Sequence, residues 1–111
     1  MADAQEGTAC LHLRDWDQAG SCLRTAMRKL DPSRSRERAV IHAQLGLAYS
    51  GQGQRNAAGE HGLRSARILA GGTNSCLCMN YLRDLERSLS PYRTKSVAGF
   101  GHTMNRNAHH E

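Results

Sequence analysis

The chain has 111 residues, a formal net charge of +5 and a low aromatic content of 5%. This length suits one domain with a modest core of Leu, Ala, Met and Cys, and the scarcity of proline and of β-branched aliphatic residues favours helices over strands. Because no apolar run approaches about 20 residues and the N-terminus lacks a signal-peptide pattern, we expect a cytoplasmic protein without a membrane partner.

Two amphipathic helices are predicted in the first half of the chain. Residues 17–30 place small or apolar side chains at helical spacing, with Asp15 positioned to cap the helix and Pro32 to end it. Residues 39–50 are apolar on more than one side, which predicts a helix packed between neighbours. The segment "GQGQ" then breaks this helix.

The second half predicts two further helices. Residues 57–69 form a helix with small residues on one face, which lets another helix approach closely. Asn74 or Ser75 then caps a fresh helix. Its apolar stripe consists of Cys78, Leu82, Leu85 and Leu89.

The predicted helices occur in pairs, and the pairs repeat. A shift of 39 residues superposes Gly7 on Gly46, Ala19 on Ala58, and Trp16 on Arg55 in the turn of each hairpin. Internal repetition of this length is typical of stacked helical solenoids. We therefore expect an all-α domain of about five helices, stacked as antiparallel hairpins in about two and a half repeats. So few repeats predict marginal stability or self-association.

This repeat domain is expected to span residues 1–100. Near its end, Val97 and Phe100 are expected to dock as a short helical turn. Residues 101–111 are mixed and polar, and we expect them to be a disordered tail.

The stretch "LGLAYSGQGQRNAA", residues 45–58, has three interpretations. A phosphate-binding loop fails, because the glycines follow a helix rather than a strand and lack the GxGxxG or GxxxxGK[ST] spacing. A DNA-reading helix–turn–helix is disfavoured, because "RNAAGEHG" offers small residues where a recognition helix carries base-reading side chains. The turn of a repeated helical hairpin accounts for the most residues.

In this third interpretation the stretch resembles the tetratricopeptide (TPR) pattern of Leu-Gly-x-x-Tyr followed by Ala after a turn. The matching residues are Leu45, Gly46, Tyr49 and Ala58. The resemblance implies that Gly46 and Ala58 touch within a hairpin, while Leu45 and Tyr49 fill the space between hairpins.

The match to the TPR pattern is incomplete. The first copy retains Gly7 and Ala19, but Cys10 stands in place of the Tyr. In the second copy Gly62 replaces an expected large residue, which predicts a loosely filled hairpin. The repeat is also longer than the usual period of about 34 residues.

Residues 6–100 also resemble the TPR-type C-terminal region of actinobacterial helix–turn–helix transcriptional regulators of the Cro/repressor type. The segment that closes the array in that family is matched by Leu89, Pro91, Tyr92, Arg93, Val97 and Phe100. The family carries a small DNA-binding domain before the repeats. No counterpart precedes residue 6, so the resemblance implies a detached or truncated effector-type region to which no DNA-contacting residue carries over.

We expect no catalytic residues, no metal and no cofactor. Cys76 and Cys78 lie too close in sequence to point the same way on a helix, and Cys22 lies on an apolar stripe, where a thiol behaves as a small hydrophobe. His42 is expected to be a half-buried, hydrogen-bonded filler. His61 lies beside Glu60, but neither is near a recognisable nucleophile.

The resemblance to TPR arrays places a binding groove along the first helix of each hairpin. Here that groove would consist of Val40, Ala43, Leu47 and Ser50, with Arg36 at the rim. It lacks the Lys/Asn set that clamps a peptide carboxylate, so we expect an extended apolar segment or a partner helix as its ligand.

The expected function is a non-catalytic protein- or peptide-interaction or sensing module. The alternative is a small basic helical protein that binds nucleic acid directly. The arginines are scattered along the chain rather than clustered, which makes direct nucleic-acid binding the less favoured hypothesis.

Overall fold

A computed structural model of the chain describes the backbone of residues 2–91 and 95–109, and the side chains of residues 4–91 and 97–104. These residues form six helices and no strand, which confirms the all-α prediction and exceeds the predicted number of helices by one. The helices are α1 (Ala2–His12), α2 (Trp16–Lys29), α3 (Ser35–Gly51), α4 (Arg55–Ala70), α5 (Cys76–Leu89) and α6 (Lys95–His109).

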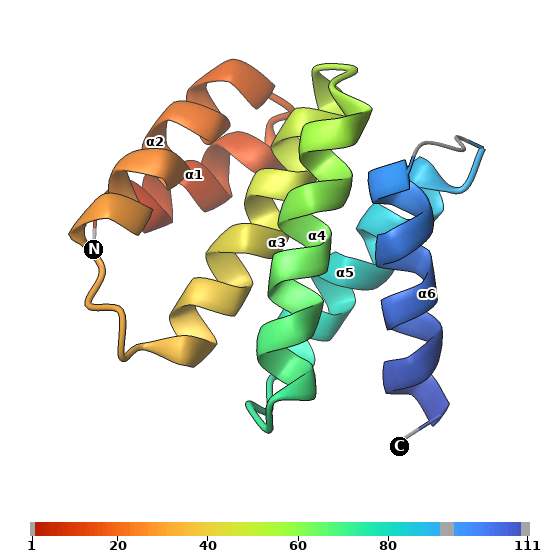
Figure 1. Cartoon of the computed structure of the whole chain (residues 1–111). Coiled ribbons are helices and arrows are strands. Elements are labelled where there is room, and N and C mark those ends of the chain that lie inside the picture. Colours follow the sequence, from red (N-terminus) through yellow and green to blue (C-terminus); the bar gives the residue numbers. More distant parts are fainter. Residues whose placement is uncertain (1, 92–94, 110–111) are drawn as a thin grey trace.

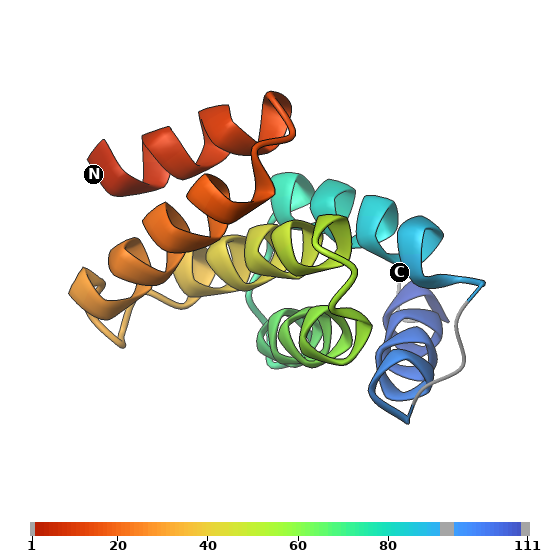
Figure 2. The same ribbon diagram turned by 90° about the horizontal axis from the view of Figure 1, so that it is seen from above.

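Helix α3 lies at the centre of the molecule (Figure 1). It packs against α4, α2 and α5, and more narrowly against α1. Short turns join α1 to α2 and α3 to α4, so each pair forms an antiparallel hairpin. Viewed from above, α1 and α5 lie on one side of α3 and α4 lies on the other (Figure 2).

The helix ends follow local signals. Asp15 caps α2 by accepting a hydrogen bond from the Gln18 backbone N–H, as predicted. Ser75, rather than Asn74, caps α5: its hydroxyl accepts from the Cys78 N–H at 3.1 Å. Gly53 adopts a positive φ of 79° in the turn between α3 and α4, a conformation that favours glycine.

Replacing the α5 cap tests its contribution to stability. We expect Ser75→Ala to lower the free energy of unfolding by about 1 kcal/mol, because the Cys78 N–H loses its hydrogen-bond acceptor. Urea denaturation measures the change. Asn74→Ala is the matched control, since Asn74 is exposed and is not the N-cap; an equal loss in the control would contradict the assignment of the cap.

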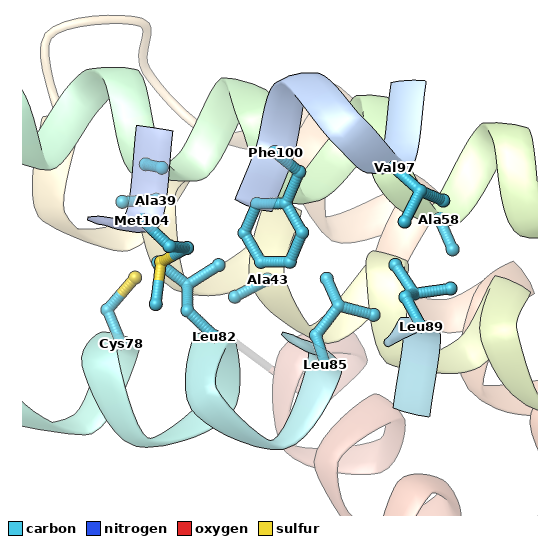
Figure 3. Packing of buried hydrophobic residues seen from close by; sticks show 11 residues of the cluster. Ala39, Ala43, Ala58, Cys78, Leu82, Leu85, Leu89, Val97, Phe100 and Met104 are labelled. Carbon is cyan, nitrogen blue, oxygen red and sulfur yellow. The ribbon is translucent and has the colours of Figure 1, made fainter. Parts of the chain in front are cut away.

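Two apolar clusters hold the helices together, and α3 contributes to both. The first lies between α1, α2 and α3, and consists of Leu11, Ala19, Leu23, Ala26, Ile41, Leu45 and Ala48. The second lies between α3, α4, α5 and α6 and contains the large side chains Leu82, Leu85 and Phe100, which face one another in Figure 3.

Glycines allow close packing within both hairpins. A Cβ atom on Gly7 would lie 2.7 Å from the Leu23 side chain of α2. A Cβ atom on Gly46 would lie 3.2 Å from the Ala58 carbonyl oxygen of α4 and 2.6 Å from Leu85. The predicted contact between Gly46 and Ala58 is therefore confirmed.

The prediction of a loosely filled second hairpin is wrong. Gly62 is buried, and a Cβ atom there would lie 2.8 Å from Leu85 and 3.1 Å from the Phe100 ring. The space left by this small residue is occupied by side chains from α5 and α6. Sequence reasoning missed them because both come from outside the hairpin.

The prediction of a disordered tail is wrong for residues 101–109, which belong to α6. Val97, Phe100 and Met104 are buried and spaced at i, i+3 and i+7, so they form one apolar stripe. The backbone of this stripe lies closest to α4, and its side chains also pack against those of α5. The closing-pattern residues Tyr92 and Arg93 lie outside the described residues, as do positions 110–111 of the predicted tail.

Candidate binding groove

A groove with a volume of about 970 Å³ crosses the N-terminal halves of α1, α3 and α5 and the end of α2. Its apolar lining consists of Ala4, Ala26, Leu30, Val40, Ile41, Leu77 and Tyr81. Leu77 is 55% exposed, so much of its side chain is open to a partner in this groove. The volume of the groove lies at the upper end of the range for ordinary ligand sites, which is about 300–1,000 Å³.

The polar groups on the floor of the groove are already hydrogen-bonded within the chain. Gln44 is 3% exposed, and its side-chain amide donates to the Thr8 hydroxyl at 2.8 Å. The Thr8 hydroxyl in turn donates to the Ala4 carbonyl oxygen at 3.0 Å. No buried side-chain nitrogen or oxygen in the described residues lacks a partner. The floor therefore requires no polar ligand and offers an apolar surface.

The rim of the groove carries charges of both signs. Its charged residues are Lys29, Asp31, Arg34, Arg36 and Glu37. Arg34 and Glu37 form an exposed ion pair at 3.5 Å, and the Ser33 backbone N–H holds the pKa of Asp31 below its usual value. This mixed rim is unlike the one-sign cluster that would capture a phosphate or a peptide carboxylate.

Only part of the predicted groove lies in the observed one. Arg36 and Val40 line it. Ala43 is fully buried in the second cluster. Leu47 and Ser50 line a separate pocket of about 320 Å³ near the α3–α4 turn.

Sequence reasoning missed the contribution of α5 to the groove. Leu77 and Tyr81 are spaced i, i+4 and lie beside the buried stripe that begins at Cys78. Leu77 and Tyr81 could have indicated this contribution from the sequence, because a helix that is apolar on two faces packs on two sides.

The repeat-signature residues are structural rather than groove residues. Gly7, Ala19, Leu45, Gly46 and Ala58 are buried between helices. Tyr49 is half-buried and stacks on His61, with ring centroids 5.3 Å apart. The Trp16 ring covers Gly51 so closely that a Cβ atom there would overlap the indole.

The histidines and cysteines do not assemble a metal site in the described part of the chain, where no three His, Cys, Asp or Glu side chains are suitably grouped. Cys78 is buried while its neighbour Cys76 is exposed. Burial raises the pKa of the Cys22 and Cys78 thiols. His42 is more deeply buried than predicted, and its Nδ1 lies 3.1 Å from the His61 Nδ1.

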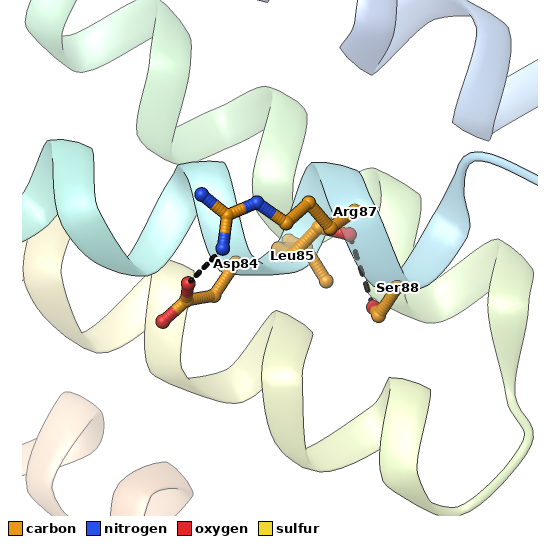
Figure 4. A network of polar contacts seen from close by, with 4 residues as sticks. All are labelled: Asp84, Leu85, Arg87 and Ser88. Atoms are coloured by element: carbon orange, nitrogen blue, oxygen red, sulfur yellow. Dashed lines mark hydrogen bonds and ion pairs between the residues drawn. The ribbon is translucent and has the colours of Figure 1, made fainter.

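Some of the arginines contact polar side chains of the chain itself. On α5, Arg87 lies 3.7 Å from the Asp84 carboxylate on the preceding turn, and Ser88 donates to the Leu85 carbonyl oxygen (Figure 4). Arg24 donates to the Tyr49 hydroxyl on another helix. None of the helices in residues 2–91 and 95–109 is long and apolar enough to cross a membrane.

Comparison with known proteins finds no family model, no curated protein and no solved structure that matches the chain.

Proposed function

We propose that the chain is a non-catalytic, TPR-like interaction module whose groove binds an apolar peptide segment or one face of a partner helix. The observation that carries this proposal is the exposed Leu77 beside Tyr81 and Val40 in a large groove whose polar floor is already hydrogen-bonded. Such a surface gains most free energy from apolar side chains of a partner.

A TPR-like stack is supported by the positions of equivalent elements. Helices α2 and α4 begin at Trp16 and Arg55, which are 39 residues apart. Gly7 and Gly46 each lie against the second helix of their own hairpin. The third pair departs from this arrangement, because the backbone of α6 lies closer to α4 than to α5. On this proposal the groove is the surface formed by the first helix of each pair.

The wider role that we propose is that of an effector or sensing region of a helix–turn–helix transcriptional regulator. It rests on the resemblance of residues 6–100 to such regions. An in-frame helix–turn–helix sequence in the DNA upstream of Met1 would support this role, and its absence would favour a free-standing interaction protein.

Selection of a random phage-displayed peptide library on the folded chain tests the binding proposal. We expect the selected peptides to be rich in apolar residues. Leu77→Asp should weaken their binding by about tenfold or more, because a carboxylate would be desolvated against the apolar lining. Fluorescence anisotropy with a labelled peptide measures the affinity.

Leu13→Asp is the matched control, because Leu13 is 79% exposed and does not line the groove. Equal weakening by both substitutions would contradict the assignment of the groove. The net charge of +5 favours one competing function, direct nucleic-acid binding. Tight duplex binding that falls steeply with salt would support that function instead.

A further inference from the structure

Two imidazoles meet between α3 and α4, outside the groove. The Nδ1 atoms of His42 and His61 are 3.1 Å apart, and the ring centroids are 5.3 Å apart with an interplanar angle of 30°. A neutral imidazole has one N–H donor and one acceptor nitrogen, so this contact is a hydrogen bond when one Nδ1 carries the proton and the other does not. It joins the two helices of the central hairpin.

A third aromatic ring extends this contact to α2. Tyr49 stacks on His61 with an interplanar angle of 8°. The Tyr49 hydroxyl accepts a hydrogen bond from Arg24 of α2 at 3.1 Å. The series Arg24, Tyr49, His61 and His42 therefore connects three consecutive helices, which lie side by side in Figure 1.

We propose that His42 and His61 form an acid-sensitive latch, which holds α3 against α4 while one Nδ1 carries a proton and the other does not, and which is broken when both Nδ1 atoms carry a proton. With two protons, both Nδ1 atoms are donors directed at each other, and two positive charges face one another across 3.1 Å.

The surroundings of the pair disfavour the charged form. His42 is 7% exposed. The charged groups that face the two rings are Arg24 from α2, Arg38 from α3, and Glu60 and Arg64 from α4. Burial, followed by the charges of His61, Arg64 and Arg38, lowers the pKa of His42 to about 4. Burial also lowers the pKa of His61, despite the opposing effect of Glu60.

The direction of the pH effect follows from proton binding. The ordinary histidine pKa of about 6.5 applies to the unfolded chain, so between about pH 6.5 and pH 4 the unfolded state binds more protons than the folded state. Stability is therefore fully present above about pH 6.5 and is lost as the pH falls toward 4. His42 alone should lower the folding equilibrium constant about 30-fold between about pH 7.5 and pH 5.

The latch is independent of the proposed groove. Val40 and Gln44 line the groove, whereas His42 lies on another face of α3, about 200° around the helix from Val40. A chain that fails to bind peptides can still have the latch, and the reverse also holds.

Proton NMR of the imidazole signals in the intact chain tests the proposal without substitution. We expect the His42 ring to titrate at about pH 4, and the His61 ring also below the ordinary value of about 6.5. If both rings titrated near 6.5, the latch would be disproved.

Urea denaturation at about pH 7.5 and about pH 5 gives the second readout. The double variant His42→Phe/His61→Phe keeps two stacked rings and removes both protonation sites, so it should lose most of the roughly 30-fold acid effect. His12→Gln, at an exposed position on α1, is the matched control and should keep the acid effect. An unchanged pH dependence in a folded double variant would overturn the proposal.

Discussion

Phe100→Ala is expected to lower the free energy of unfolding by about 3–5 kcal/mol, a larger loss than we expect from either the cap substitution at Ser75 or overpacking at Gly46. Phe100 is 1% exposed and fills the space above Gly62 of α4 beside Leu85 of α5. Its truncation would leave a cavity into which the surrounding helices can collapse only in part. Because a domain of this size is stable by only about 5–15 kcal/mol, urea denaturation will show a large shift of the midpoint.

His102→Ala is the control for this substitution, since His102 is exposed on the same helix. It should change stability by no more than about 0.5 kcal/mol. A Phe100→Ala variant as stable as the wild type would mean that α6 does not dock on α4. The disordered tail that the sequence predicts would then be the correct description of residues 101–109.

Gly46→Val is expected to lower the free energy of unfolding by about 1–3 kcal/mol through overpacking. The first added carbon already lies 3.2 Å from the Ala58 carbonyl oxygen and 2.6 Å from Leu85. A β-branched side chain cannot avoid both the Ala58 carbonyl oxygen and the Leu85 side chain, so α3 and α4 must move apart. Thermal denaturation followed by circular dichroism at 222 nm measures the loss of stability.

Gly101→Val separates overpacking from the effect of changing a helical glycine. A Cβ atom on Gly101 has no neighbour within 4 Å, so the larger residue meets open space on α6. This control should be neutral or slightly stabilising, because glycine is a poor helix former. Equal destabilisation by both substitutions would contradict the close approach of α3 and α4 at Gly46.

Helices α2 and α5 could be predicted from local signals. Asp15 and Ser75 are caps whose side chains accept the expected backbone hydrogen bonds. The stripe at Cys78, Leu82, Leu85 and Leu89 is buried throughout, as the spacing predicted. Each of these signals acts within one helix, so it can be interpreted without knowledge of the neighbours.

Helix α6 could not be predicted in full because its stability comes from packing. Gly99 and Gly101 lower its helix propensity, and its buried residues are only three, Val97, Phe100 and Met104, among the described side chains. The helix is stabilised by Gly62, which leaves room for the Phe100 ring on α4. The room for the Phe100 ring therefore depends on two segments that lie far apart in the sequence.

The sequence did not locate the observed groove for a similar reason. Of the residues that the TPR resemblance implies, Arg36 and Val40 line this groove. Ala43 is buried instead, because α5 packs against that side of α3 and covers it. The contribution of Leu77 depends on how far α1 and α5 stand apart across α3, a distance that no local pattern encodes.

The most direct test of the proposed groove is a map of backbone amide chemical-shift changes when a selected apolar peptide is added to the ¹⁵N-labelled chain. We expect the largest changes at Thr8, Val40, Gln44, Leu77 and Tyr81, which line the groove from three helices. Amides on α6 and around the separate pocket lined by Leu47 and Ser50 should change little. Changes concentrated outside the groove, or saturable changes with duplex DNA and none with any selected peptide, would contradict the account.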